Sequence, residues 1–371
     1  MAGTGAAYAS PQSLARRIWT RHPTAMSMVE LHQGDERNAS AAALRTSIYA
    51  AVDLGTNNCR LLVARPADGG FRVIDAFSRV VRLGEGLAAS GLLSESAMCR
   101  TLEALAVCAT KMRRRGVTTA RAVATEACRR AGNCGEFIDR TRRTTGIQLE
   151  IISSAEEARL ALDGCAPLLT LDPPFALVFD IGGGSTELNW LEIDANNQVK
   201  VLGSVSLPCG VVTLSERYGS GRIGADRYEA MVGEVTAALE PFEARHRIVP
   251  QVAGGMVQML GTSGTVTTLA GVHLGLERYQ RAVIDGYTLD FGAIATVSRR
   301  LAEMECDHRA TLPCIGPERA DLVVAGCAIL EAICRLWPVG RVRVADRGLR
   351  EGILFRLMGR HSIGSRIGVP A

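Results

Sequence analysis

The stretch Ala176-Leu-Val-Phe-Asp-Ile-Gly-Gly-Gly-Ser-Thr-Glu-Leu188 decides how the rest of this chain is read. Its apolar first residues predict a buried strand that ends near Asp180. The three glycines that follow allow positive φ angles and let backbone amides converge on an oxyanion. Asp180 and Glu187 are hard oxygen ligands of the kind that Mg²⁺ uses, which makes them the candidate metal ligands. The stretch alone fits equally well a glycine-rich hairpin turn with two surface carboxylates.

A second copy of this motif, Ala51-Val-Asp-Leu-Gly-Thr-Asn-Asn-Cys-Arg-Leu61, lies nearer the N-terminus. It aligns with residues 178–188 without a gap, so that Asp53 matches Asp180. Both copies predict a strand, an acidic turn and a second strand. Such a repeat indicates two related halves that face each other across a cleft and hold one phosphorylated ligand from both sides.

Three polar turns supply the candidate phosphate ligands. The first two turns contribute Asp53, Gly55, Thr56, Asn57, Asn58, Gly182, Gly183, Gly184, Ser185 and Thr186. The third, Gly261-Thr-Ser-Gly-Thr265, stands between a predicted strand and a predicted helix and contributes Gly264 and Thr265. Glycines and hydroxyls at such a corner suit a phosphate or a nucleoside. The alternative is a helix start capped by Ser or Thr.

Composition limits the classes of function. The chain has 371 residues, of which 47% are hydrophobic and 22% charged, enough for two domains with full cores. A formal charge of +4 and 5% aromatic residues argue against a nucleic-acid binder. No stretch approaches the roughly 18 consecutive apolar residues of a membrane span. We therefore expect neither nucleic acid nor a membrane as a partner.

Cysteine and histidine are scattered along the chain. The 11 cysteines contain no Cys-x-x-Cys pair, and the six histidines have no neighbours at metal-ligand spacing. This usage gives no zinc signature and indicates a reducing compartment, so we expect a cytoplasmic protein. Histidine catalysis is not expected.

The hydrophobic periodicity and a proline-rich linker divide the chain into three predicted segments. Residues 1–47 lack sustained periodicity and are expected to form a disordered N-terminal tail, with a transit peptide as the alternative. Leu171-Asp-Pro-Pro174 resembles a linker between domain I, residues 48–172, and domain II, residues 173–371. Strands and helices alternate in both domains, which predicts an α/β fold. The last helix is expected to be able to pack back on domain I.

Two further segments carry charged residues that allow two interpretations. In Ser153-Ser-Ala-Glu-Glu157, each serine and the glutamate three residues later fit a capping box, which the residues alone favour for Glu157. The alternative makes one glutamate a base that activates water for attack on phosphorus. Arg129 or Arg130 follows a strand-to-helix corner suited to an anion, and the alternative is a surface arginine.

Seven motifs together resemble the exopolyphosphatase and guanosine pentaphosphate phosphatase (Ppx/GppA) family of the actin-like ATPase superfamily. They cover residues 48–354 in the order of that family. The motifs are Asp53-Leu-Gly-Thr-Asn, Thr125 to Arg129, Ile152-Ser-Ser-Ala-Glu-Glu-Ala-Arg-Leu, Asp180-Ile-Gly-Gly-Gly-Ser-Thr-Glu-Leu, Gly261-Thr-Ser-Gly-Thr, Gly316-Pro-Glu-Arg-Ala-Asp and Asp346-Arg-Gly-Leu-Arg-Glu-Gly. The resemblance implies two actin-like (ribonuclease H-like) domains that face each other across a cleft.

The resemblance also implies a reaction. It is the release of terminal phosphate from polyphosphate or guanosine pentaphosphate, with Mg²⁺ or another divalent cation, by a homodimer. By the same resemblance Glu157 is the catalytic base, Asp180 and Glu187 bind the metal, and Arg129 contacts phosphate. This overrides the preference for a purely capping Glu157, although both roles can coexist.

The chain departs from the family pattern at three points. Ser154 replaces a glycine before the glutamates, and Thr56 and Asn58 replace serines of the first turn. The sequence also ends soon after the two halves, without the long helical extension of larger members, which favours short chains or a pppGpp-like nucleotide. One alternative is a non-catalytic regulator that binds (p)ppGpp or polyphosphate. A kinase or ATPase of the same superfamily is disfavoured by the Glu156–Glu157 pair.

Overall fold

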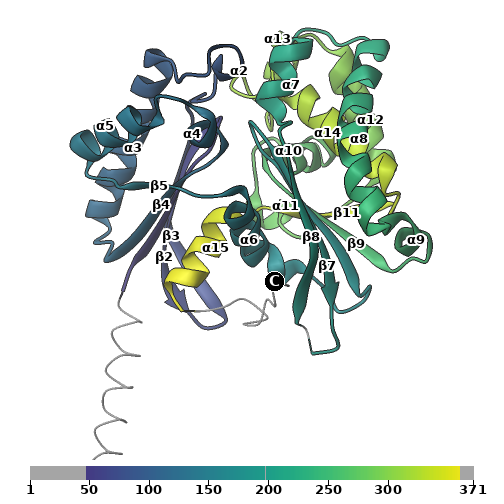
Figure 1. Ribbon diagram of the computed structural model, residues 1–371, viewed down its shortest axis with the longest axis horizontal. Coiled ribbons are helices and arrows are strands. Elements are labelled where there is room, and N and C mark those ends of the chain that lie inside the picture. Colours follow the sequence, from purple (N-terminus) through teal and green to yellow (C-terminus); the bar gives the residue numbers. More distant parts are fainter. Residues whose placement is uncertain (1–46, 197, 360–371) are drawn as a thin grey trace, which may run out of the picture. The chain divides into compact units, whose positions relative to one another are not determined.

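Two mixed β-sheets form the framework of the structure, a computed structural model that describes residues 47–196 and 198–359 (Figure 1). Sheet A has the strand order β3-β2-β1-β4-β5, and sheet B has the order β10-β11-β9-β6-β7-β8. All these strands belong to one compact unit. Apart from residue 47, the predicted N-terminal tail lies outside the described residues.

The two sheets repeat one arrangement. The strands of sheet A are β1 (Tyr49–Leu54), β2 (Asn58–Ala67), β3 (Gly70–Val80), β4 (Thr119–Ala124) and β5 (Leu149–Ile151); those of sheet B are β6 (Phe175–Ile181), β7 (Thr186–Ile193), β8 (Val199–Leu207), β9 (Val257–Thr262), β10 (Thr288–Asp290) and β11 (Arg341–Ala345). The first strand of each half pairs antiparallel with the next strand and parallel with a later one: β1 with β2 and β4, β6 with β7 and β9. The predicted α/β class is confirmed.

Helices cover both faces of each sheet. The helices of the described residues are α2 (Leu87–Ser90), α3 (Glu95–Arg114), α4 (Glu126–Arg130), α5 (Cys134–Thr145), α6 (Ser154–Cys165), α7 (Val211–Tyr218), α8 (Ala225–His246), α9 (Ile248–Ala253), α10 (Gly264–His273), α11 (Arg281–Ile284), α12 (Phe291–Glu303), α13 (Cys306–Ala310), α14 (Val323–Leu336) and α15 (Leu349–Leu357). Figure 1 shows α3 and α5 on the outer face of sheet A and α8, α12 and α14 on the outer face of sheet B. None of the helices in the described ranges is long and apolar enough to cross a membrane.

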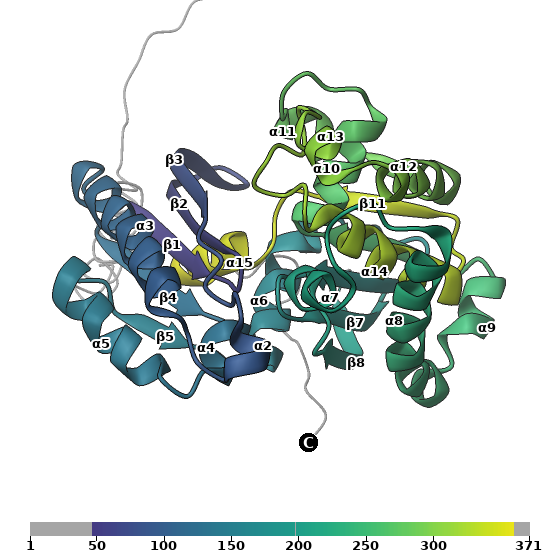
Figure 2. The same cartoon turned by 90° about the horizontal axis from the view of Figure 1, so that it is seen from above.

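Helices α6 and α15 lie between the two sheets (Figures 1 and 2). Leu160 of α6 and Ile353 of α15 are buried in a common core with the inner face of sheet A. The C-terminal end of α6 buries Cys165 against the inner face of sheet B. Helix α15 therefore packs on sheet A although it follows the last strand of sheet B in the chain.

Local sequence signals explain several helix boundaries. Ser94 stands just before an amphipathic stretch and is predicted to be an N-cap; it caps α3 by accepting a hydrogen bond from the backbone N–H of Ala97. Of the two serines predicted to cap α6, Ser153 accepts the hydrogen bond from the Glu156 N–H. Proline is common in the first turn of a helix, so the sequence predicts a helix that opens at Pro317, but α14 begins only at Val323. Residues 316–322 form successive turns, which begin at a glycine with a φ of +69°.

Candidate active site between two phosphate loops

The turns that join β1 to β2 and β6 to β7 have the same construction. In the first turn the Gly55 N–H donates to the carbonyl oxygen of Asn58, and in the second the Gly182 N–H donates to that of Ser185, both at 2.9 Å. We call residues 55–58 phosphate loop 1 and residues 182–185 phosphate loop 2. Their matching geometry is what the gapless alignment of the two sequence copies predicts.

The residues that flank the two loops differ in charge. Strand pairing places Asp53 directly opposite Arg60 on β2, and Asp180 directly opposite Glu187 on β7. Cross-strand partners of this kind lie about 5 Å apart and interact strongly. One half of the site therefore carries a carboxylate with a cation, and the other half carries two carboxylates.

The two phosphate loops touch each other. A Cβ atom added to Gly183 would lie 3.0 Å from the Cβ of Thr56 and 3.2 Å from the backbone nitrogen of Asn57. One added to Gly184 would lie 2.7 Å from the Thr56 hydroxyl oxygen. The glycines are required here because another chain segment fills the space that a side chain would need.

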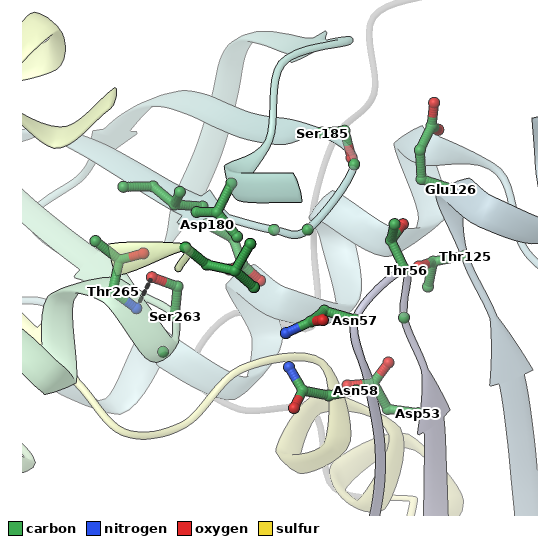
Figure 3. Close-up of a pocket in the computed structure, with 18 of the residues that line it drawn as sticks. Asp53, Thr56, Asn57, Asn58, Thr125, Glu126, Asp180, Ser185, Ser263 and Thr265 are labelled. Atoms are coloured by element: carbon green, nitrogen blue, oxygen red, sulfur yellow. Dashed lines mark hydrogen bonds between the residues drawn. The ribbon is translucent and has the colours of Figure 1, made fainter. Parts of the chain in front are cut away.

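A pocket lies where the loops meet. Figure 3 shows Asp180, Ser263 and Thr265 on one side of it, and Asn57 and Asn58 on the other. Of the residues predicted from the sequence, the following line the pocket: Asp53, Gly55, Thr56, Asn57, Asn58, Glu157, Asp180, Gly182, Gly183, Gly184, Ser185, Gly264 and Thr265. One pocket thus brings together both phosphate loops, the third predicted turn and the candidate base.

Three of the predicted site residues are not among those that line this pocket. The Thr186 hydroxyl donates to the carbonyl oxygen of Cys209 at 2.7 Å, and the residue is fully buried. Glu187 lies behind the loop, where it accepts hydrogen bonds from the hydroxyls of Ser185 at 2.6 Å and Ser206 at 2.9 Å. Arg129, the third of these residues, lies behind Glu157. Thr186 and Glu187 are the first two residues of β7. Side chains along a strand alternate between the two faces of the sheet, so these two side chains point to opposite faces.

Arg129 joins two glutamates. Its guanidinium lies 2.7 Å from Oε2 of Glu157 and 2.8 Å from Oε2 of Glu126, and it also donates to the carbonyl oxygen of Ile152 at 3.0 Å. Both side chains of the Arg129–Glu157 pair are largely buried. The ion pair therefore orients the Glu157 carboxylate at the edge of the pocket.

The pKa values of four carboxyl groups in the site are raised. Removal from bulk water, together with the charge of Glu187, raises the pKa of Asp180 to about 7. The same two causes raise the pKa of Glu157, although Arg129 acts in the opposite direction. Burial also raises the pKa values of Asp53 and Glu187. These carboxylates repel one another, and a bound cation would relieve that repulsion.

The donor set fits a magnesium-type cation. Asp180 and Glu187 offer carboxylate oxygens, and the buried side-chain oxygens of Asn57 and Asn58 have no hydrogen-bond partner. Within residues 47–196 and 198–359, no three His, Cys, Asp or Glu side chains are grouped as a complete metal cage. Mg²⁺ typically uses one or two carboxylates and takes its other ligands from phosphates and water, so a complete cage is not required.

The structure adds residues that the sequence interpretation did not select. Glu126, Arg60, Arg319, Ser263 and Thr268 all line the pocket. Arg60 was detectable, because it occupies the position in the first copy that Glu187 occupies in the second. Ser263 accepts hydrogen bonds from the N–H groups of Thr265 and Val266 as the cap of α10, so the third turn combines the capping role with a place in the pocket.

A second, larger pocket adjoins the first and shares Asp53, Asp180 and Arg319 with it. Five arginines line this arginine pocket: Arg60, Arg281, Arg319, Arg347 and Arg350. Two of them are paired with carboxylates, Arg281 with Glu351 at 3.0 Å and Arg347 with Asp285. Five carboxylates line it as well, so its formal charges balance and it offers individual guanidinium groups beside the phosphate loops: Asp53, Asp180, Glu318, Asp346 and Glu351.

Two solved structures resemble this fold. An exopolyphosphatase from Cytophaga hutchinsonii superposes with a TM-score of 0.76 over 86% of this chain and 100% of its own, and its 24% identity supports the fold alone. An Aquifex aeolicus member of the Ppx/GppA protein family has a TM-score of 0.68 at 26% identity, covering 84% of this chain and 98% of its own. These similarities confirm the predicted fold of two actin-like halves.

Sequence comparison gives the same result. The chain is 30% identical over 314 residues to a guanosine-5'-triphosphate,3'-diphosphate pyrophosphatase of Aeromonas hydrophila. The matched region covers 85% of this chain and 60% of that protein. A related pyrophosphatase of Aeromonas salmonicida is 29% identical over the same shares. The model of the Ppx/GppA phosphatase family matches residues 62–361. With most of the sequence matched in this way, the chain belongs to the Ppx/GppA phosphatase family.

Proposed function

We propose that this chain hydrolyses a terminal phosphoanhydride bond, releasing inorganic phosphate from polyphosphate or from guanosine pentaphosphate. The observation that carries the proposal is the direct contact of the two phosphate loops at one pocket, which Glu157 and Asp180 both line. Phosphoryl transfer depends mainly on positioning and on neutralising charge, which two opposed loops with converging amides provide. The chain spans 60% of the length of the curated relatives it matches, so their activity is proposed here for this chain.

In this mechanism the phosphate loops hold the terminal phosphoryl group, and Glu157 accepts a proton from the attacking water. A bond forms between the water oxygen and phosphorus while the bond to the bridging oxygen breaks, which leaves inorganic phosphate and a substrate shorter by one phosphate. Burial and the charge of Glu187 raise the pKa of Glu157, which makes its carboxylate a stronger base toward the attacking water. Arg129 orients this carboxylate through their ion pair.

A divalent cation such as Mg²⁺ would be held by Asp180 and Glu187, and when bound it neutralises charge on the phosphates. Glu187 keeps its orientation through the hydroxyls of Ser185 and Ser206. These hydrogen bonds favour its ionised form, which is the form that binds a cation.

The arginine pocket is the proposed place for the remainder of the substrate. Its guanidinium groups suit bidentate contacts with phosphate oxygens. It shares Asp53, Asp180 and Arg319 with the phosphate-loop pocket, so a chain of phosphates can pass from one pocket into the other. We propose short polyphosphate and guanosine pentaphosphate as the substrates to compare.

The test is phosphate release by purified protein with Mg²⁺, offered short polyphosphate, long polyphosphate and guanosine pentaphosphate in parallel. Glu157→Gln should lower kcat at least about a hundredfold, the size of a general-base contribution, while the protein stays folded. The matched control is Glu156→Gln, because Glu156 pairs with Arg121 and does not line the pocket. Release that survives Glu157→Gln would contradict the assigned base. Binding without release by the wild type would favour the non-catalytic regulator.

A further inference from the structure

Residues 81–86, which join β3 to α2, are hydrogen-bonded to phosphate loop 1. The N–H groups of Val81 and Arg82 both donate to the carbonyl oxygen of Asn57, at 2.8 and 3.0 Å, and the Gly84 N–H donates to that of Thr56 at 2.9 Å. A Cβ on Gly84 would lie 2.3 Å from the Thr56 methyl group. This bracing segment therefore supports the loop along its backbone.

The bracing segment also reaches the opposite half of the molecule. Nη1 of Arg82 lies 2.7 Å from Oδ2 of Asp321, and the Gly86 N–H donates to Oε1 of Glu216 at 3.0 Å. Asp321 and Glu216 belong to the half built on sheet B. Figures 1 and 2 both show α2, which follows the segment, next to α7, which carries Glu216. Asp321 is two residues from Arg319, which lines both pockets.

The backbone of Arg82 indicates that its side chain has a specific role. Its φ of +49° lies in the left-handed region, which glycine and asparagine adopt more readily than arginine. A strained residue persists where the surrounding structure requires it. Here the two amide hydrogen bonds to loop 1 fix the backbone, and the ion pair with Asp321 is the contact that only a cationic side chain supplies.

An ordinary surface ion pair is the competing explanation, and such pairs contribute little. Two observations separate this pair from that class. The side chains of Arg82 and Asp321 are 35% and 22% exposed, so both are partly shielded from water. The pair also joins residues 239 positions apart, on opposite sides of the cleft. Its loss therefore affects how the halves are held together as well as a local contact.

We propose that Arg82 is a positioning residue, whose ion pair with Asp321 holds phosphate loop 1 against phosphate loop 2. Its effect on catalysis rests on the proposed function. Without the pair the bracing segment keeps only the Gly86–Glu216 hydrogen bond to the opposite half, and the partners of the Thr56 and Asn57 carbonyl oxygens are held less firmly. Both the bound substrate and the transition state then meet a looser loop, so KM should rise while kcat changes little.

Three variants isolate the ion pair. Arg82→Asn removes the cation but accepts a positive φ, and Asp321→Asn removes the anion without changing the bracing segment. The double variant Arg82→Asp with Asp321→Arg restores a pair of opposite charges, again with a residue that tolerates the backbone. The matched control is Glu229→Gln, which breaks the Arg335–Glu229 pair between α14 and α8 inside one half.

The first readout is independent of activity. In substrate-free protein, hydrogen exchange of the amides in residues 81–86 should accelerate about tenfold in both single variants, a change in opening equilibrium of about 1.4 kcal/mol. It should return toward the wild-type rate in the double variant and stay unchanged in Glu229→Gln. Unchanged exchange in Asp321→Asn would overturn the proposal, even if Arg82→Asn showed an effect.

The second readout is the KM for phosphate release, with the substrate that the wild type hydrolyses. We expect an increase of about tenfold in each single variant, with kcat within about twofold of the wild type. A fall in kcat with an unchanged KM would contradict the positioning role. If the wild-type protein releases no phosphate, the proposed function is refuted instead. The exchange result alone then tests whether the Arg82–Asp321 pair holds the bracing segment.

Discussion

Gly183 and Gly184 occupy positions where any side chain would meet the opposite half of the molecule. Because they have no side chain, the backbone of loop 2 can come close to Thr56 and Asn57, as the proposed binding of one phosphate by both loops requires. At the residue scale, the site therefore depends on the side chains that are absent as much as on the carboxylates that are present.

We predict that Gly183→Ala separates the two phosphate loops. The added Cβ would lie 3.0 Å from the Cβ of Thr56 and 3.2 Å from the backbone nitrogen of Asn57, and the backbone cannot move aside freely. The neighbours must give by a few tenths of an ångström. Because a misplacement of about 1 Å costs about a hundredfold, we expect kcat/KM to fall about tenfold, which phosphate-release kinetics will measure.

The control for this substitution is Gly233→Ala, in the interior of α8, where an added Cβ would meet nothing within 4 Å. It should leave activity unchanged and stabilise the helix by about 1 kcal/mol. Wild-type activity in Gly183→Ala would show that the loops do not act as a closed pair.

At the scale of elements, Asp75 links β3 to the C-terminal end of α3 through two ion pairs. Its carboxylate lies 2.8 Å from Nζ of Lys111 and 2.9 Å from Nε of Arg115, and its side chain is only 13% exposed. The hydrogen bonds from Lys111 and Arg115 hold the pKa of Asp75 below its usual value. The basic end of α3, which the sequence shows as a run of charges, is thus partly neutralised by the neighbouring strand.

A lowered pKa has a defined consequence for stability. Asp75 binds its proton less readily in the folded state than in the unfolded chain, where its pKa is about 3.9. Its stabilising contribution is therefore complete above that value and is lost as the pH falls through the folded pKa. Asp75→Asn should lower the free energy of unfolding by about 1 kcal/mol at pH 7 and by much less at pH 3, as measured by urea denaturation.

Glu192→Gln is the control for this pH dependence. Glu192 pairs with Lys200 at 3.4 Å, and both side chains are well exposed, so its loss should change stability very little at either pH. An equal loss of stability in Asp75→Asn at pH 7 and pH 3 would mean that packing, and not charge, explains the effect.

At the scale of the whole described molecule, α6 and α15 connect the two halves through a very close crossing. A Cβ on Gly352 would lie 1.9 Å from the carbonyl oxygen of Leu160, and one on Gly164 would lie 2.0 Å from that of Gly348. The crossing joins the core under sheet A to the core under sheet B, because α6 contributes buried residues to both.

We predict that Gly352→Ala destabilises the protein by about 3 kcal/mol, at the upper end of overpacking effects, because the obstacle is helix backbone. The midpoint of urea unfolding will measure this change. Gly292→Ala, in α12, where nothing lies within 4 Å of the added Cβ, is the control and should not be destabilised. A stable Gly352→Ala protein would show that the two helices can separate without loss of structure.

Much of the fold was accessible from the sequence because its signals are local. The two Asp-x-Gly turns, the strands around them and the Ser94 cap each depend on a few consecutive residues, and the structure contains them. The repeat itself predicted two halves of one topology. The helix start at Pro317 was wrong, because residues 316–322 form turns instead.

The sequence by itself determined the type of site, namely two phosphate loops with carboxylates in an α/β fold of two similar halves. Tertiary structure alone decided which side chains reach the pocket. Thr186 and Glu187 are not among the residues that line it, since their side chains are hydrogen-bonded to Cys209 and to Ser185 and Ser206, whereas Arg60 and Arg319 line it. It also paired Arg82 with Asp321, 239 positions away. Local patterns cannot specify such pairs, because they arise only when two separately formed sheets pack around α6 and α15.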